Sequence, residues 1–347
     1  MSNEEFLITP GNLPDYLAAQ GLIERAEDVT VRELGGGVSN LVLLVESLDG
    51  ARRWVVKQSL GKLRVKDDWR SDRGRIFREA EALECLKPSL GAYAIPQVIH
   101  VDRASYLYVM TAAPAGSVPW KEQLLGRRAD LAVAREAGAF LAQMIAASRH
   151  DPQFREKFGD RSVFDQLRID PYYRTAAARH PDVAAALQDL IADSWKIQTA
   201  LVHGDYSPKN MLVRREKIFL IDFEVIHWGD PAFDSGFLLN HLFLKAFHQR
   251  SVAEIFIEAA REFWKTLLNA LMFEQRAAGD FERMTVRHLG GLMLARIDGK
   301  SPVEYIQDQE TKERVRRAAK RILLERPERL EEVVTMVRHA PFLQQGM

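Results

Sequence analysis

The sequence predicts an α+β protein in two parts: a smaller part with five antiparallel strands and one helix, and a larger, mostly helical part. Short aliphatic runs separated by turn residues occupy residues 30–60, and two more follow at 97–101 and 106–110. Longer Ala- and Leu-rich segments with helical spacing fill most of the chain beyond residue 114. A length of 347 residues also exceeds what one hydrophobic core usually serves.

The elements of the smaller part are indicated by their turns. Gly35-Gly36-Gly37 and Asp49-Gly50 separate the aliphatic runs between residues 31 and 56, and the Asp-Gly pair is typical of a β-hairpin. Residues 73–87 carry apolar side chains at helical spacing, with Pro88 just past the expected end of this helix.

The larger part is predicted from four segments whose apolar residues recur at helical spacing: 131–148, 182–198, 253–274 and 309–325. Pro and Gly interrupt the pattern at 111–117. We therefore expect residues 1–112 to form the first domain and residues 113–347 to form the second.

The charges of the chain balance, since there are 48 Lys and Arg and 48 Asp and Glu. Nucleic-acid-binding proteins neutralise phosphates with a basic surface, so this class is not expected. The single cysteine, Cys85, excludes an internal disulfide. No secretory signal is visible, and no apolar stretch reaches the roughly 18–20 residues that span a bilayer. We therefore expect a cytoplasmic protein without a nucleic-acid or membrane partner.

Residues 201–224 contain the side chains that indicate chemistry. Asp205 and Asn210 share one loop, and Asp222 directly follows the aliphatic run 218–221. Phosphoryl transfer needs a carboxylate near the attacking hydroxyl, and hard oxygen ligands that hold divalent cations on the phosphates. These three side chains supply both. Singly, each would be an ordinary solvated turn residue; together, between apolar strands, they indicate a site.

A known family carries the same motifs. The run His203-Gly204-Asp205-Tyr206-Ser207-Pro208-Lys209-Asn210, followed by Ile221-Asp222-Phe223, resembles the aminoglycoside phosphotransferase and choline kinase family, which is related to the protein kinases. The resemblance extends to Gly229-Asp230-Pro231-Ala232-Phe233-Asp234, which looks like a helix-starting segment of that family. It implies a bilobal protein-kinase-like fold with a nucleotide-binding sheet and a helical lobe that holds the catalytic loop and the acceptor site.

The resemblance also implies roles for individual residues. Asp205 would be the catalytic base, and Asn210 and Asp222 would be the Mg²⁺ ligands. His203 would support the loop structurally, and Asp234 would brace it.

In the smaller part, the resemblance implies contacts with the nucleotide. Lys57 would hold the α- and β-phosphates and pair with a glutamate of the helix. Glu79 is favoured because it stands at the edge of the buried face, while Glu81 and Glu84 remain alternatives. The loop Gly36-Gly37-Val38-Ser39-Asn40 would cover the phosphates with backbone amides. Without the resemblance, Lys57 would be interpreted as a surface residue at the end of a strand, and the glycine-rich loop as an ordinary tight turn.

Candidate acceptor contacts are Glu224, Arg296 and Asp298. Helix ends that line the acceptor site are common in this family, and mixed charge would suit a sugar-like or anionic acceptor better than a polycation. The alternative is a plain helix terminus with cationic capping, which ends at Gly299.

The sequence therefore predicts an ATP- and Mg²⁺-dependent kinase that phosphorylates a hydroxyl of a small molecule. Backbone groups at Met110 and Ala112 would meet the adenine edge. The alternative is a catalytically silent nucleotide-binding pseudokinase or scaffold. The intact set of Lys57, Asp205, Asn210 and Asp222 disfavours it. The acceptor, the choice between ATP and GTP, and the oligomeric state stay open at this stage.

Overall fold

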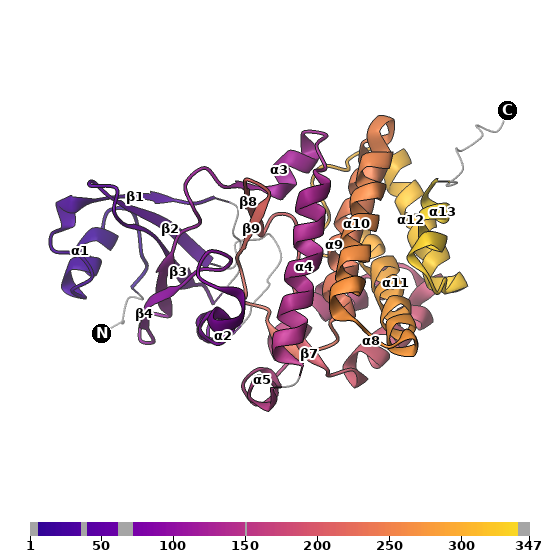
Figure 1. Ribbon diagram of the computed structural model, residues 1–347, viewed down its shortest axis with the longest axis horizontal. Coiled ribbons are helices and arrows are strands. Elements are labelled where there is room, and N and C mark those ends of the chain that lie inside the picture. Colours follow the sequence, from indigo (N-terminus) through magenta and orange to yellow (C-terminus); the bar gives the residue numbers. More distant parts are fainter. Residues whose placement is uncertain (1–5, 36–39, 62–71, 150, 339–347) are drawn as a thin grey trace. The chain divides into compact units, whose positions relative to one another are not determined.

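The computed structural model describes residues 6–35, 40–61, 72–149 and 151–338, which form two compact units (Figure 1). The first unit comprises Met1–Ala115 together with Ile221–Glu224, and the second comprises Gly116–Leu220 together with Val225–Met347. The division after Ala115 differs by three positions from the boundary expected after residue 112. The return segment Ile221–Glu224, which carries Asp222, was expected in the second domain and belongs to the first unit.

The first unit contains the predicted five-stranded antiparallel sheet, in the order β1-β2-β3-β5-β4. Its elements are α1 (Leu13–Ala19), the 3-10 turn Ala26–Asp28, β1 (Val29–Glu33), β2 (Asn40–Ser47), β3 (Arg53–Ser59), α2 (Arg75–Leu90), β4 (Val98–Asp102) and β5 (Leu107–Thr111).

Two features of this unit differ from the prediction. The sequence indicates one helix, and the structure has a second, α1, whose Leu13 and Leu17 are buried against Leu43 and Val56 of the sheet. Seven residues are too few to show a helical period in the sequence. The other helix, α2, continues through Pro88 to Leu90, because a proline in the last turn removes only one terminal hydrogen bond.

The second unit is predominantly helical. Its elements are β6 (Val118–Pro119), α3 (Trp120–Leu125), α4 (Leu131–Ser148), α5 (Pro152–Phe158), α6 (Ser162–Phe164), the π-helical segment Asp165–Arg174, α7 (Thr175–Arg179), the 3-10 turn Pro181–Val183, α8 (Ala184–Lys196), β7 (Ala200–Val202), β8 (Met211–Arg214), β9 (Lys217–Leu220), β10 (His227–Gly229), α9 (Ala232–His248), the 3-10 turn Arg250–Val252, α10 (Ala253–Leu271), α11 (Gln275–Asp298), α12 (Gln309–Glu325) and α13 (Leu330–Arg338).

Helix α9 lies at the centre of this unit. Every residue from Ala232 to Phe247 is buried, and α10, α11 and α12 pack against the helix. At Gly236 the neighbouring helix approaches so closely that a Cβ atom would lie 2.8 Å from the Cβ of His288. A helix that is buried on all sides is a core element. The polar residues His241 and Lys245 on α9 are therefore enclosed by protein.

Short strands position the loop that carries Asp205. β7 pairs with β10, and β8 pairs with β6 and β9, so the segment 203–210 leaves one two-stranded sheet and enters a three-stranded one. Both ends of the loop are thus anchored in buried strands.

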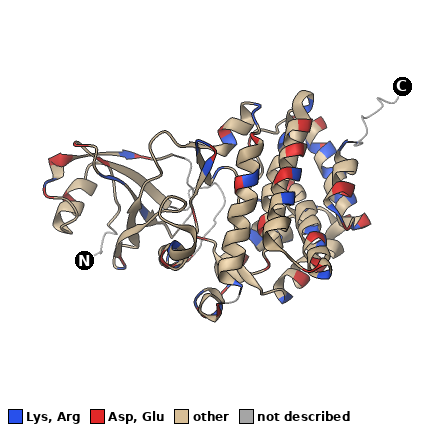
Figure 2. Ribbon diagram, in the orientation of Figure 1, with Lys and Arg blue, Asp and Glu red and all other residues tan. Residues whose placement is uncertain are grey.

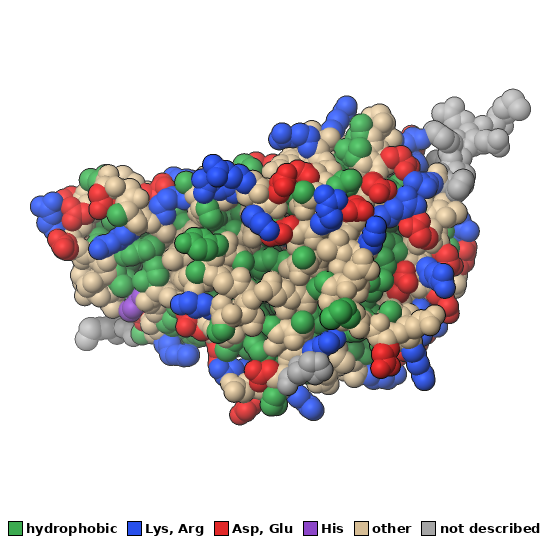
Figure 3. Space-filling view, in the orientation of Figure 1, with side chains coloured by type: hydrophobic (Ala, Val, Ile, Leu, Met, Phe, Trp, Pro, Cys, Tyr) green, Lys and Arg blue, Asp and Glu red, His purple; other side chains and the backbone are tan. Residues whose placement is uncertain are grey.

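The two signs of charge are interspersed along the helices of the second unit (Figure 2). In the face shown in Figure 3, basic and acidic side chains alternate over these helices without a continuous basic patch. Among the described residues, no helix combines the length and the apolar character needed to cross a bilayer.

Candidate functional site

A buried lysine and two carboxylates meet in the first unit. The Lys57 Nζ atom on β3 lies 2.7 Å from Oε2 of Glu79 on α2 and 2.7 Å from Oδ1 of Asp222. The other oxygen of Glu79 accepts a hydrogen bond of 3.0 Å from the backbone N–H of Phe223. Glu79 therefore links β3 to the return segment and is, among the glutamates considered from the sequence, the partner of Lys57.

Burial and charge act in opposite directions on this cluster. Burial would lower the pKa of Lys57, but Asp222 and Glu79 raise it above its ordinary value, so the amine stays charged. Burial raises the pKa of Glu79 to about 7, although Lys57 opposes the change. Asp222 has a φ of 73°, a left-handed conformation that is uncommon for a residue with a side chain. Such backbone conformations concentrate at functional sites.

The carboxylate of Glu224 is held inside the first unit. Nδ2 of Asn40 donates to its Oε2 atom at 2.8 Å, and Nε of Arg75 lies 3.2 Å from the same oxygen. All three side chains are buried. These contacts tie the return segment to β2 and α2. These contacts explain why the Glu224 and Asn40 side chains are buried. The burial of Glu224 therefore needs no contact with the acceptor, and the burial of the Asn40 side chain needs no contact with a phosphate.

The backbone of β5 is committed to the sheet. The N–H of Ala112 donates to the carbonyl oxygen of Arg53, and the N–H of Thr111 donates to that of Gln97, both at 2.9 Å. In an antiparallel sheet, the backbone N–H and C=O groups of successive residues point alternately toward the two neighbouring strands. The peptide groups of Met110 therefore face β3, on the same side as the N–H of Ala112. The expected adenine contacts are therefore wrong for the backbone of Met110 and for the N–H of Ala112.

In the second unit, Asp234 holds the catalytic-loop backbone. Its two carboxylate oxygens accept hydrogen bonds from the N–H groups of His203 and Gly204, at 2.6 and 2.9 Å. Nδ1 of His203 in turn accepts from the N–H of Asp205 at 3.1 Å. Gly204 has a φ of 77°, and a Cβ atom there would lie 2.7 Å from Cγ1 of Val225. Only glycine fits this turn.

Asp205 is 4% exposed and lies between two cations. Its Oδ2 atom is 2.9 Å from Nζ of Lys209 and 3.1 Å from Nη2 of Arg168. Burial alone would raise the pKa of Asp205, but Lys209 and Arg168 lower it well below its usual range. The carboxylate is therefore ionised at neutral pH and accepts hydrogen bonds.

Asn210 and Asp222 offer the ligands that Mg²⁺ prefers. Nδ2 of Asn210 donates to the backbone oxygen of Asp205 at 2.9 Å, which turns the side-chain oxygen of Asn210 the other way. The Asp222 side chain retains 24% exposure. Among the described residues, no group of three or more His, Cys, Asp or Glu could hold a metal ion. Mg²⁺ commonly needs only one or two protein groups, with phosphates and water completing the shell, so each of these two side chains, in its own unit, has the chemistry that the ion requires.

Asp298 is engaged in a structural clamp. Its carboxylate oxygens lie 2.7 and 2.9 Å from two guanidinium nitrogens of Arg316 on α12, and Nε2 of His180 lies 2.9 Å away. A carboxylate with these partners joins α11 to α12 and to the 3-10 turn region. These partners favour the helix-terminus alternative for Asp298, and its contact with the acceptor stays a prediction.

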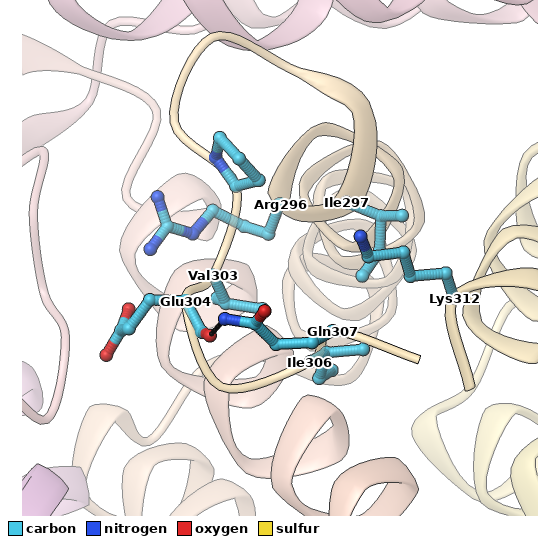
Figure 4. Close-up of a pocket in the computed structure, with 8 residues that line it drawn as sticks. Arg296, Ile297, Val303, Glu304, Ile306, Gln307 and Lys312 are labelled. Carbon is cyan, nitrogen blue, oxygen red and sulfur yellow. Dashed lines mark hydrogen bonds between the residues drawn. The ribbon is translucent and has the colours of Figure 1, made fainter. Parts of the chain in front are cut away.

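Arg296 has different surroundings. Its Nη1 atom bonds to Oη of Tyr172 at 3.3 Å, and also contacts the backbone and hydroxyl of Ser301. Arg296 lines a pocket of about 290 Å³ at the C-terminal end of α11. Figure 4 shows its guanidinium and the Glu304 carboxylate reaching to the same side, away from Lys312. Arg296 thus remains a candidate for contact with a small molecule.

Comparison with known proteins identifies the family of this chain. Residues 30–282, well over half of the chain, match the model of the phosphotransferase enzyme family. The chain belongs to this family. The resemblance predicted from the motifs at 203–210 and 221–223 is thereby confirmed.

Curated relatives include methylthioribose kinase 2 of Oryza sativa subsp. japonica, which is 26% identical over 258 residues, covering 66% of this chain and 60% of the relative. The chain thus spans less than two thirds of that relative's length.

Among solved structures, the ethanolamine kinase of Plasmodium vivax has a TM-score of 0.57 at 13% identity, covering 94% of this chain and 93% of that one. An amicoumacin kinase in complex with AMP-PNP, Ca²⁺ and Ami has a TM-score of 0.54 at 14% identity, covering 94% of this chain and all of the other. These similarities show the fold, and the predicted protein-kinase-like α+β class is confirmed.

The predicted site residues fall into three groups. Within the first unit the structure brings together Lys57, Glu79 and Asp222, and within the second it brings together His203, Asp205, Asn210 and Asp234. Gly36, Gly37 and Ser39 lie outside the described residues.

Sequence reasoning missed two cations beside Asp205. Lys209 stands four positions after it in the same loop, a spacing from which the pairing could have been expected. Arg168 comes from the π-helical segment, far away in the sequence, and no local pattern indicates it.

Proposed function

We propose that this protein is a kinase that transfers the γ-phosphoryl group of ATP to a hydroxyl group of a small molecule. The observation that carries the proposal is the environment of Asp205: a buried, ionised carboxylate in a loop fixed by Asp234 and followed by the metal-ligand candidate Asn210. Membership of the phosphotransferase family supports the reaction class.

In the proposed reaction, Asp205 accepts a hydrogen bond from the acceptor hydroxyl and orients its oxygen toward the γ-phosphorus. The new bond forms between that oxygen and phosphorus, the bond to the β-phosphate oxygen breaks, and the hydroxyl proton passes to Asp205. A carboxylate with a lowered pKa is a weak base. It suffices because the transition state of phosphoryl transfer is loose, and orientation matters more than early deprotonation.

The remaining residues would serve the nucleotide. Lys57 would place its amine, held charged by Glu79 and Asp222, against the α- and β-phosphates. Asn210 and Asp222 would hold Mg²⁺, which when bound neutralises phosphate charge. ATP is the proposed donor, supported by the AMP-PNP bound to the amicoumacin kinase of the same fold. We place this activity in the cytoplasm.

A catalytically silent pseudokinase is disfavoured because Lys57, Asp205, Asn210 and Asp222 are all present and the first three are held by ordered contacts. The relatives named above differ in acceptor, so a screen has to cover methylthioribose, ethanolamine, choline, aminoglycosides and hydroxylated acids.

The test is ADP release with this panel, for the wild type and for Asp205→Asn. We expect kcat to fall about 10²- to 10⁴-fold in the variant, the range typical of losing a general base, with ATP affinity nearly unchanged. Asp189→Asn, an exposed aspartate on α8, is the matched control. Equal turnover by the wild type and Asp205→Asn would refute the assignment.

A further inference from the structure

One face of α9 carries two buried polar side chains, His241 and Lys245, in the interior of the second unit, and it ends at the exposed His248. Phe237, His241, Lys245 and His248 follow one another at intervals that place them on the same side of the helix. At one end, the ring of Phe237 stacks with that of Tyr172 at 6.1 Å. At the other end, the rings of His248 and Tyr305 lie 5.2 Å apart. This row, called the α9 polar face below, needs an explanation because buried polar groups are costly without partners.

Lys245 is the most telling member of the α9 polar face. It is 1% exposed, and it donates a 3.3 Å hydrogen bond to the backbone oxygen of His241 and lies 5.0 Å from the ring of Tyr305. Among the described residues, the only acidic group that acts on it is Glu304, which is already paired with Lys121. Burial, Lys121 and Arg296 together lower the pKa of Lys245 to about 7.

Two further donors nearby lack partners. Nε of Arg296 and the hydroxyl of Tyr305 are buried and make no hydrogen bond to any residue that the structure describes. Native proteins rarely leave such groups unpaired unless a ligand, ion or water takes the place. The acidic group that acts on Lys245 and Arg296 is Glu304, and its ion pair is with Lys121, so the donors on Lys245, Arg296 and Tyr305 point to a further acceptor of hydrogen bonds that carries negative charge.

The α9 polar face is continuous with the surroundings of Asp205. The guanidinium groups of Arg296 and Arg168 both lie over the ring of Tyr172, at 5.7 and 5.6 Å. Arg168 also contacts Asp205. In addition, burial and the charges of Lys245, Arg296 and Lys209 lower the pKa of His241, while the charge of Asp205 opposes them.

The charge in this region is unbalanced. Among the described residues, its cations are Lys121, Arg168, Lys209, Lys245 and Arg296, whereas its carboxylates are Asp205, Glu304 and the buried Asp234. A site for a cationic amine would need the opposite excess, because unpaired like charges reject such a ligand.

We propose that the acceptor carries an oxyanion group, a carboxylate or a phosphate, which binds Lys245 and Arg296 while its hydroxyl reaches Asp205. This inference rests on the proposed kinase function and deepens it by naming the substrate class. Lys245 and Arg296 determine specificity, and Asp205 acts on the hydroxyl.

The test uses acceptors matched in carbon skeleton: glycerol, glycerate and glycerol 3-phosphate, and glucose, gluconate and glucose 6-phosphate, with choline and kanamycin as cations. We expect an acid or a phosphate ester to exceed its neutral partner in kcat/KM by about 10- to 100-fold, as for a hydrogen-bonded charge. The two kinds of anion separate the sources of the oxyanion.

Variants then locate the anion. Lys245→Met should raise the KM for the anionic acceptor about 10- to 100-fold, with kcat and the KM for ATP little changed. It removes a buried charge, so the fold is expected to tolerate it, and Arg296→Gln provides a second variant. Lys265→Met, on the exposed side of α10, is the matched control. Preference for a neutral or cationic acceptor, or an effect of Lys245→Met on the KM for ATP alone, overturns the inference.

A binding measurement keeps the two proposals distinguishable. With the nucleotide site saturated by Mg²⁺ and ADP, sulfate should raise the Tm of the wild type more than that of Lys245→Met. If no compound is turned over but this difference is present, the kinase proposal fails and the anion site stands. If the difference is absent, the anion site fails, whatever the turnover.

Discussion

Lys57→Met is the substitution whose effect on stability the structure defines most closely. It removes an amine that lies 2.7 Å from both Glu79 and Asp222. Glu79 is 1% exposed, so water cannot hydrate its carboxylate when Lys57 is removed. Breaking a buried ion pair from one side typically costs about 3–5 kcal/mol.

The cost depends on pH because Glu79 can neutralise itself by taking up a proton. In the wild type, burial raises the pKa of Glu79 from 4.5 to about 7 even with Lys57 beside it. Without Lys57 the folded-state pKa rises further. A carboxyl group whose folded pKa is raised loses stability as pH rises between its unfolded and folded pKa values, and this window extends to higher pH in the variant.

The sign of the difference follows. Below about pH 7 Glu79 is protonated in both proteins, so their free energies of unfolding lie close together. Above pH 7 the gap should widen by about 1.4 kcal/mol per pH unit, reaching about 3 kcal/mol near pH 9. Asp222 contributes less, because its side chain is 24% exposed and partly solvated.

Urea denaturation at pH 6, 7, 8 and 9 measures this gap for the wild type, Lys57→Met, and the double variant Lys57→Met/Glu79→Gln. The double variant has no titrating group at position 79, so its stability should lack the decline with pH that Lys57→Met shows, and its deficit at high pH should be smaller than that of Lys57→Met. Lys87→Met, an exposed lysine on the same α2 helix, is the matched control. A deficit of Lys57→Met that is largest at pH 6, or that survives in the double variant at pH 9, refutes the reasoning.

Two further substitutions test the loop around Asp205. Gly204→Ala should cost about 1–3 kcal/mol of stability through its left-handed backbone and its contact with Val225. Gly279→Ala on α11, whose new Cβ would make only an ordinary 3.5 Å contact with the side chain of Arg283, should instead stabilise slightly. Equal effects of the two substitutions on thermal unfolding would contradict this. Asp234→Asn leaves one of two backbone N–H groups without an acceptor, so we expect about 1–3 kcal/mol of destabilisation and a lower kcat with unchanged ATP affinity. An unchanged kcat would remove Asp234 from the positioning of Asp205.

The sequence was most informative where function and local structure coincide. Asp205 and Asn210 stand in a short motif whose turns and apolar strands are local, so their shared loop could be predicted without long-range contacts, whereas the unit to which Asp222 belongs could not. The pairing of Lys57 with Glu79 was also within reach, because both positions fall on predictable elements, a strand end and a helix face.

Other features depend on contacts between distant segments. Arg168 contacts Asp205 from a π-helical segment that has no sequence signature. Asp298 forms an ion pair with Arg316 of the next helix. Glu224 likewise binds Asn40 and Arg75, which are remote in the sequence. A charged residue shows its type in the sequence but not its partner, and the partner decides whether it serves the fold or a ligand.

Lys245 shows the same limit from the opposite side. Within α9 it stands among Leu244, Ala246 and Phe247, and the sequence marks this helix as core. Lys245 is significant because, among the described residues, the carboxylate that acts on it, Glu304, is paired with Lys121. An unbalanced buried charge becomes visible only when every neighbouring element is in place.

The environment of Asp205 gives the two proposals a common physical basis. Lys209 and Arg168 make this carboxylate a weak base by lowering its pKa, so it contributes by orienting the hydroxyl. The same cations, with Lys245 and Arg296, would offset the repulsion between an anionic acceptor and the triphosphate. A cationic acceptor would need no such compensation and would be repelled by four positive side chains. The features that weaken Asp205 as a base are thus those that would let two anions meet beside it.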